Sequence, residues 1–269
     1  MVTDREWTRQ KEYQRIADTF KKIGDYKQMY QDYAVVSQDA WDDTERNDYQ
    51  LDLWYNLNCN EICLEMLGNL CEGKRVLTVG GGFWVEKAML DHITAQEIIR
   101  TDIIADEGVL EEDAQNLSFA NSSFDVVICR ELIEHVPDEQ KVFSEIRRVL
   151  RPQGYLLITT PNVFSLAVDG TFHVRGYTPS SFLAELEHQG FTITKKRGNL
   201  PYCFHGLKIY SQQGITQALD EYKELDKLTR DYENRYYLGT QLFVLCQREN
   251  ENGSKENGSL VYGNHERWQ

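Results

Sequence analysis

Three consecutive glycines, Gly80 to Gly82, and an aspartate twenty positions after the last of them, Asp102, are the residues whose types and spacing best suit ligand binding. The glycines follow an apolar run, RVLTV at 75–79, and a helical pattern begins shortly after them. A strand that ends in glycines and continues as a helix lets the backbone approach a ligand where a Cβ would collide. An acidic residue that ends the next strand can accept hydrogen bonds from ribose hydroxyls. The sequence therefore predicts a site for a nucleotide-like cofactor.

Two longer blocks follow in a fixed order. They are DAQNLSFANSSFDVVICRELIEHV at 113–136 and RRVLRPQGYLLITTPN at 147–162, and FHVRGYTPSSFLAELEHQGF at 172–191 continues the pattern. Together with the glycine loop and Asp102, these blocks closely resemble the class I S-adenosylmethionine-dependent methyltransferases. Within that family they are similar to the ubiquinone/menaquinone-type small-molecule branch. The resemblance covers about residues 73–198, and 240–247 fits the last strand.

This resemblance implies S-adenosyl-L-methionine as the cofactor and assigns its contacts residue by residue. The glycine loop, and in it Gly80 and Gly82, would line the methionine part, and Asp102 would hold the ribose hydroxyls. The remaining implied contacts are Ile103, Asp113 and Ala114 at the adenine, and Cys129 and Arg130 near the methionine part, with Gly81 completing the loop.

Two positions depart from the family pattern. Thr78 stands where the family usually has an acidic residue, and Trp84 stands where it has a third glycine. A threonine can donate a hydrogen bond, but it brings no charge to the ammonium end of the cofactor. The rival interpretation is a dinucleotide-binding dehydrogenase, whose fingerprint requires glycine or alanine where this chain has Val85. That mismatch favours S-adenosylmethionine over NAD.

Methyl transfer is an in-line displacement at a sulfonium carbon, so the protein mainly supplies proximity and alignment. A base is needed only when the acceptor is protonated at the working pH. The candidates for a catalytic or acceptor contact are His173, His135 and Glu131, with Glu134 beside them. The alternatives are a packed histidine for His135 and a structural carboxylate at a helix start for Glu131. No His/Cys cluster has the spacing of a zinc site, so we expect no metal.

Strand-like and helical segments alternate along the chain, which predicts a parallel sheet covered by helices on both faces. The strand-like segments are 75–79, 97–101, 124–129, 154–160, 191–197 and 240–247, and the helical patterns between them are 84–92, 106–112, 138–150 and 178–189. With the resemblance, this predicts an α/β, Rossmann-like methyltransferase fold. Its seven-stranded sheet would be mostly parallel, with an antiparallel last strand.

We expect three parts in the chain. Residues 1–72 form an N-terminal helical cap, 73–248 the methyltransferase core with an insertion at 199–239, and 249–269 a disordered polar tail. The cap and the insertion are rich in aromatic residues and are expected to shape the acceptor pocket. The second half of the insertion has the pattern of a charged helix, which would be a lid, a homodimer contact or a solvated face.

Composition limits the partners. The net charge of −14 argues against nucleic acid or an anionic membrane surface as the main partner and leaves neutral or cationic small molecules. No apolar run is long enough to span a bilayer, and the first residues lack the apolar segment of a signal peptide. The six cysteines form no CxxC pair, so we expect reduced thiols and a cytoplasmic protein.

The sequence thus predicts an S-adenosylmethionine-dependent methyltransferase that acts on O or N of a small organic acceptor, such as a specialised metabolite. One alternative is a C-methyltransferase of a quinone-like ring. Another, of a different class, is a cofactor-binding regulatory protein without transferase activity, a hypothesis that the substitutions at Thr78 and Trp84 keep open.

Overall fold

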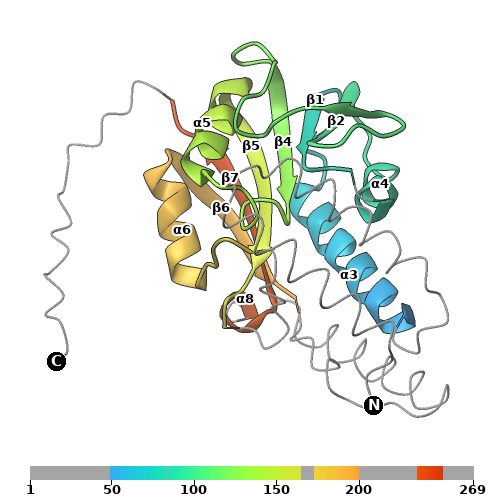
Figure 1. The fold of residues 1–269 in the computed structure, drawn as a ribbon, viewed down its shortest axis with the longest axis vertical. Helices are drawn as coiled ribbons and strands as arrows, with labels where there is room; N and C mark the ends of the chain where they lie inside the picture. Colours follow the sequence, from blue (N-terminus) through green and yellow to red (C-terminus); the bar gives the residue numbers. More distant parts are fainter. Residues whose placement is uncertain (1–48, 83, 165–172, 200–234, 251–269) are drawn as a thin grey trace, which may run out of the picture.

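A single open sheet forms the centre of the molecule. The computed structural model describes residues 49–82, 84–164, 173–199 and 235–250 (Figure 1). Its strands are β1 (Arg75–Val79), β2 (Glu97–Asp102), β3 (Val109–Glu111), β4 (Phe124–Arg130), β5 (Leu150–Pro161), β6 (Phe191–Gly198) and β7 (Gln241–Arg248). The described helices are α3 (Tyr49–Leu67), α4 (Trp84–Leu90), α5 (Glu139–Val149), α6 (Pro179–His188) and α8 (Arg235–Leu238).

The seven strands lie in the order β3-β2-β1-β4-β5-β7-β6. Strands β1 to β5 pair in parallel, whereas β7 is antiparallel to both of its neighbours, β5 and β6. The predicted fold class, a mostly parallel seven-stranded sheet with an antiparallel last strand, is confirmed. Strand order reverses at β1. From β1 the chain runs outward to β2 and β3, and it then returns to form β4 on the other side of β1. Ligands of open α/β sheets bind at the carboxyl ends of the strands at such a point.

One predicted element is wrong. The segment 106–112 was expected to be helical, but Val109–Glu111 forms β3 and pairs in parallel with β2. Gly108 has a φ of +71°, a left-handed turn conformation that ends any helix and leads into the strand. Val109 is buried and the next two residues are exposed. A three-residue edge strand contains too little alternation to be told from a turn of helix in the sequence.

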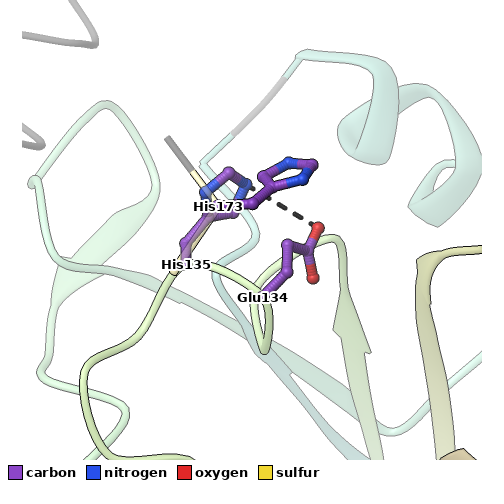
Figure 2. A group of neighbouring side chains, drawn as sticks. All are labelled: Glu134, His135 and His173. Atoms are coloured by element: carbon purple, nitrogen blue, oxygen red, sulfur yellow. Dashed lines mark ion pairs between the residues drawn. The ribbon is translucent and has the colours of Figure 1, made fainter. Parts of the chain in front are cut away.

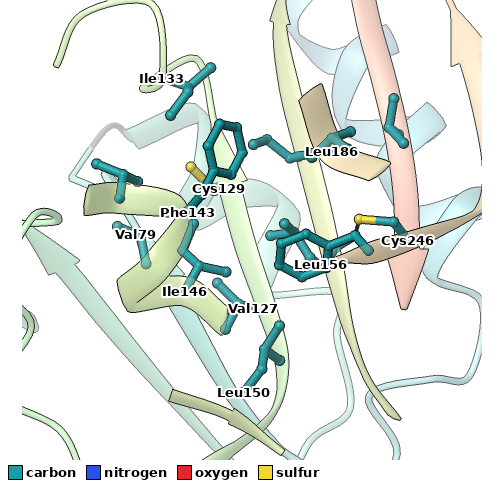
Figure 3. Packing of buried hydrophobic residues seen from close by; sticks show 14 of the residues in the cluster. Val79, Val127, Cys129, Ile133, Phe143, Ile146, Leu150, Leu156, Leu186 and Cys246 are labelled. Atoms are coloured by element: carbon teal, nitrogen blue, oxygen red, sulfur yellow. Dashed lines mark hydrogen bonds between the residues drawn. The ribbon is translucent and has the colours of Figure 1, made fainter. Parts of the chain in front are cut away.

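Helices cover both faces of the sheet. On one face, Phe143 and Ile146 of α5 and Leu186 of α6 pack on side chains from the sheet (Figure 3). On the other, α3 and α4 pack on Val76, Ile128 and their neighbours. Successive residues of β4 alternate between the two cores, as the two-residue period of a strand requires. Each large apolar side chain removed from water in this way contributes roughly 1.5–3 kcal/mol.

Polar caps fix where the helices begin. The side chain of Asp138 accepts a hydrogen bond from the backbone N–H of Lys141 at the start of α5. Thr178 and Ser181 form a reciprocal capping box at the start of α6, and Pro179 occupies the first turn. These caps hold the two loops that lead into α5 and α6, and both loops carry predicted site residues.

The predicted division of the chain is only partly covered by the described residues. Within the predicted cap, the structure describes the helix α3, while 1–48 lie outside the described residues. Most of the insertion, 200–234, and the tail from 251 also lie outside them. Glu249, assigned to the tail, still donates its backbone N–H to the carbonyl of Gly190 at 3.0 Å. Within the described part of the chain, no helix is both long and apolar enough to cross a membrane.

Candidate functional site

The glycine loop is tied to the neighbouring strand. Gly80 has a φ of +77°, in the left-handed region that favours glycine. The N–H of Gly81 donates to the carbonyl of Thr101 at 2.8 Å, and the guanidinium of Arg100 donates to the carbonyl of Gly81, also at 2.8 Å. The loop therefore has a defined position at the carboxyl ends of β1 and β2.

The other two glycines are required by close neighbours. A Cβ on Gly81 would lie 2.1 Å from Oγ1 of Thr78, and a Cβ on Gly82 would lie 2.8 Å from Oδ2 of Asp102. Both distances are below any normal contact, so a side chain at either position would force the loop to move. The loop connects β1 to α4, and these close contacts hold its backbone against the carboxyl ends of β1 and β2.

Asp102 ends β2, as the sequence predicts, and its carboxylate can accept more hydrogen bonds than it accepts from the protein backbone. Its Oδ2 accepts the N–H of Gly82 at 3.0 Å, and its Oδ1 accepts that of Ile104 at 3.3 Å. Burial raises the pKa of this carboxyl, while the backbone N–H donors act in the opposite direction. A carboxylate can accept about four hydrogen bonds. Its remaining lone pairs suit the two hydroxyls of a ribose.

The residues expected at the adenine follow Asp102 in space. The N–H of Glu112 donates to the carbonyl of Asp102 at 2.8 Å, so the segment that contains Asp113 and Ala114 begins beside β2. Asp113 accepts the N–H of Gln115 at 2.8 Å and so caps its own turn, and Ala114 is buried. Ile103 is half-buried. Their contact with an adenine stays a prediction.

A buried charged group lies beneath the glycine loop. Glu86, in the first turn of α4, is 4% exposed, and its Oε1 lies 3.3 Å from the position that a Cβ on Gly81 would take. Burial raises the pKa of Glu86 to about 7, opposed by the positive charges of Arg130 and Arg100. Nη1 of Arg130 donates to Oδ1 of Asn60 at 2.7 Å. Sequence reasoning missed Glu86; the available signal was a carboxylate between the apolar residues of a short helix.

Cys129, predicted near the methionine part, has its thiol in the hydrophobic core. The residue is fully buried, and it packs in the same cluster as Val79 and Ile133. Burial raises the pKa of the thiol well above its ordinary value. Its neighbour Arg130 points to the opposite side of the strand, toward Asn60 of α3. Cys129 could therefore contact a cofactor through its backbone, and Arg130 through its side chain.

A second cluster, formed by Glu134, His135 and His173, joins two loops (Figure 2). The ring centroids of His135 and His173 are 4.8 Å apart at an interplanar angle of 73°. Nε2 of His135 lies 3.7 Å from Oε1 of Glu134, which is 1% exposed. The ligand atoms of the three side chains all lie within 4.8 Å of one another, so the cluster could also hold a divalent cation.

Backbone and side-chain contacts bring these two loops together. The N–H of Val174 donates to the carbonyl of Glu134 at 2.9 Å. Arg175 donates to the carbonyl of Ile133 at 2.7 Å and forms an ion pair with Glu139 of α5. The guanidinium of Arg175 is thus engaged in holding the turn after β4. It acts on the cluster by fixing where Glu134 and His135 stand.

Glu131, the third predicted catalytic residue, is held by the sheet. It has a φ of +46°, which is unusual for a residue other than glycine. Its Oε1 accepts the hydroxyl of Thr159 at 2.7 Å, and its Oε2 accepts the side-chain amide of Gln241 at 2.9 Å. With both oxygens occupied, Glu131 joins the end of β4 to β5 and β7. A catalytic role for it stays a prediction.

The carboxyl of Glu134 is electrostatically different from that of Glu86. Burial raises its pKa well above the ordinary value, and the negative charge of Glu131 adds to that increase. One oxygen accepts the hydroxyl of Thr160 at 3.0 Å. The other oxygen, Oε1, lies 3.7 Å from Nε2 of His135, an ionic contact that is longer than a hydrogen bond.

Comparisons with known proteins agree with the topology. Residues 88–158 match the methyltransferase domain family. A probable S-adenosylmethionine-dependent methyltransferase of Mycolicibacterium smegmatis is 29% identical over 165 residues, which cover 55% of this chain and 62% of that protein. A ubiquinone biosynthesis O-methyltransferase of Albidiferax ferrireducens is 29% identical over 143 residues, covering 45% and 56%. The chain therefore spans less than two thirds of the length of either relative.

Among solved structures, a chain of the Haloferax volcanii complex between a methyltransferase activator and a methyltransferase superposes with a TM-score of 0.50. It is 13% identical, and the match covers 76% of this chain and 97% of that one. This likeness supports the fold alone. Together with the family match and the relatives, it confirms the predicted resemblance to the class I S-adenosylmethionine-dependent methyltransferases.

Proposed function

We propose that this chain, which carries a methyltransferase domain of the S-adenosylmethionine-dependent type, transfers a methyl group to an oxygen or nitrogen atom of a small organic acceptor. The supporting observation is the glycine loop, whose Gly81 and Gly82 leave no room for a Cβ against Thr78 and Asp102. The O-methyltransferase among the relatives favours oxygen. The acceptor expected from the acidic, aromatic-rich sequence is neutral or cationic.

When bound, the cofactor supplies an activated methyl group on a sulfonium. The protein residues then have two tasks. On the cofactor side, Asp102 accepts hydrogen bonds from the ribose hydroxyls, the glycine loop lines the amino-acid end, and Asp113 and Ala114 lie on the adenine side. Holding the two reactants in line is the main contribution of such a site, since proximity and alignment can be worth roughly 7–11 kcal/mol.

On the acceptor side, His173 accepts the proton of a hydroxyl or ammonium group as the acceptor attacks. A neutral imidazole suits this task near neutral pH. His135 packs edge-on against the ring of His173, at 4.8 Å between centroids. Glu134 lies beside His135, with its Oε1 3.7 Å from Nε2 of the imidazole. His173 is therefore the proposed base, and His135 and Glu134 position it.

Two alternatives remain distinct from this proposal. A C-methyltransferase of a quinone-like ring would use the same cofactor side, and so would a regulatory protein that binds the cofactor without turnover. Incubation with labelled cofactor and a panel of phenols, amines and quinols separates them, because mass spectrometry and NMR locate the new methyl group. Tight cofactor binding with no turnover on any acceptor would favour the regulatory protein. The homodimer and the cytoplasmic location expected from the sequence stay predictions.

The cofactor side is tested directly by calorimetry. We expect wild-type protein to bind S-adenosylmethionine and S-adenosylhomocysteine but not NAD. Asp102→Ala removes two hydrogen bonds to a charged acceptor, about 1.5–3 kcal/mol each. The exposed Asp91→Ala is the control and leaves the affinity unchanged. Equal affinity of wild type and Asp102→Ala would remove Asp102 from this role.

A further inference from the structure

The glycine loop covers a carboxylate that the proposed function has not used. Glu86 is 4% exposed, and its Oε1 has no hydrogen-bond partner in the described structure. A buried acceptor without a partner costs free energy, so it is uncommon unless something else binds it. The hydroxyl of Thr78 is buried and unpartnered as well. Both groups lie against Gly81, at 3.3 and 2.1 Å from its would-be Cβ.

The position of Glu86 compensates for Thr78, which stands where the family pattern has an acidic residue. Thr78 brings no charge to the loop, although the amino-acid end of the cofactor carries an ammonium. Glu86 brings a negative charge to the same glycine from the neighbouring helix α4. A buried cation-binding site needs such a charge, because an unpaired ammonium is costly to remove from water.

The surrounding charges also match this ligand. Three carboxylates, those of Glu86, Asp102 and Glu131, lie near two guanidinium groups, those of Arg100 and Arg130. When all are ionised, the group carries one net negative charge. S-adenosylmethionine carries one net positive charge, from its sulfonium, ammonium and carboxylate. An anionic pocket of this kind favours a cationic ligand.

We propose that Glu86 binds the ammonium group of the cofactor's amino-acid end, taking the place of the acid that this chain lacks at Thr78. This inference rests on the proposed function. Nε of Arg130 is another buried atom without a hydrogen-bond partner among the described residues. The positive charge of Arg130 lowers the pKa of Glu86 and so favours the ionised form that binds an ammonium. Glu86 is thus the residue that distinguishes the complete cofactor from a nucleoside lacking the amino acid.

Two ligands test this distinction by calorimetry. S-adenosylhomocysteine carries the ammonium, whereas 5′-deoxy-5′-methylthioadenosine has the same nucleoside and thioether but no amino-acid end. Glu86→Gln is expected to weaken binding of S-adenosylhomocysteine roughly 10- to 100-fold, the loss of a hydrogen bond to a charged group. Binding of the methylthioadenosine stays within about twofold.

Two further variants serve as controls. Asp102→Ala weakens both ligands, because both keep the ribose. Glu107→Gln, at an exposed site, changes neither. If Glu86→Gln is folded, with an unfolding temperature at or above that of wild type, but binds S-adenosylhomocysteine as tightly as wild type or weakens both ligands equally, the inference is wrong. If wild type binds neither ligand, the proposed function fails instead.

A measurement on the wild type keeps the inference testable if Glu86→Gln does not fold. Since the pKa of Glu86 is about 7 and an ammonium favours the ionised form, the affinity for S-adenosylhomocysteine should rise several-fold between about pH 6 and about pH 8. The affinity for methylthioadenosine should stay constant. Parallel pH profiles for the two ligands would overturn the inference.

The charged and titratable groups that face Glu86 are Arg130, Arg100, Asp102, Cys63 and Cys129.

Discussion

The two sides of the candidate site are built in different ways. The cofactor side consists of backbone and short side chains on adjacent strands, since the glycine loop is tied to β2 through Thr101 and Asp102. The acceptor side consists of long side chains on two loops far apart in the sequence, with His173 beside His135. One side can thus be inferred from a local motif, whereas the other exists only after the chain has folded.

Each side also contains one buried carboxyl, and their electrostatic surroundings are opposite. Glu86 has Arg130 and Arg100 as its nearest charges, which lower its pKa to about 7 from the value that burial alone would give. Glu134 has the carboxylate of Glu131 as its strongest neighbour, which raises its pKa further. The same residue type therefore has positive neighbours that favour its ionised form on one side, and a negative neighbour that favours its protonated form on the other.

The largest expected effect is on the acceptor side. If His173 is the base, His173→Ala should lower turnover by roughly 10²–10⁴, while the affinity for S-adenosylhomocysteine stays the same. The acid limb of the rate profile, near the histidine pKa, should also vanish. Steady-state kinetics measured across pH test both points, with the exposed His92→Ala as the control.

If His173 only positions the acceptor, the Michaelis constant rises and the pH profile keeps its shape. Wild-type turnover and wild-type acceptor affinity in His173→Ala would contradict both roles and make His135 the next residue to replace. A loss of cofactor affinity in His173→Ala would show that the cofactor side and the acceptor side do not act independently.

The second prediction concerns the two buried carboxyls. A raised pKa means that the folded state binds the proton more tightly, so each carboxyl makes the protein less stable as pH rises above about 4.5. For Glu86 the cost levels off near pH 7, at about 3 kcal/mol. For Glu134 the cost likewise grows as pH rises toward its raised pKa. Urea unfolding of Glu86→Gln and Glu134→Gln between about pH 4.5 and about pH 8 measures both.

We expect each variant to be more stable than wild type above pH 4.5, with the gain of Glu86→Gln levelling off near pH 7. Unfolding free energies that differ from wild type by a constant amount at every pH would show that neither carboxyl titrates as described.

The smallest effect concerns the loop itself. Gly81→Ala places a Cβ 2.1 Å from Oγ1 of Thr78 and should lower the free energy of unfolding by about 1–3 kcal/mol. Thr78→Ala removes that oxygen and should recover part of the loss in the double variant. The control is Gly108→Ala, which has no neighbour within 4 Å and should show no coupling to Thr78. Additive effects of Gly81→Ala and Thr78→Ala would argue against the contact.

Sequence reasoning reached the fold, and it placed the glycine loop and Asp102 at strand ends, because these features depend on short-range patterns. The turn after β1 and the acid that ends β2 are local features, and the strand order was implied by the resemblance. The edge strand β3 was missed because three residues give no period to recognise. Glu86 was missed because a glutamate in a helix is ordinarily solvated, and its burial depends on how α4 packs against α3 and the sheet.

The acceptor side was predicted only as a set of candidates. His135 and His173 were named, but their edge-on contact depends on Arg175, whose bonds to the turn after β4 are long-range. Glu131 was expected near the chemistry, whereas its hydrogen bonds to Thr159 and Gln241 depend on the antiparallel return of β7. Contacts of this kind join residues far apart in the chain, so no local sequence pattern predicts them.

The two edge strands of the sheet determine whether copies of the protein can associate by strand pairing. An open edge presents unpaired N–H and C=O groups that can template a strand from another molecule. Of the strands described, β3 ends the sheet after three residues and leads into the acidic Glu111–Glu112. At the other edge, β6 has a shifted register between Ile193 and Lys195, and Lys195 is exposed. Brevity and charge at one edge, and a bulge with lysine at the other, disfavour strand-to-strand aggregation at high protein concentration.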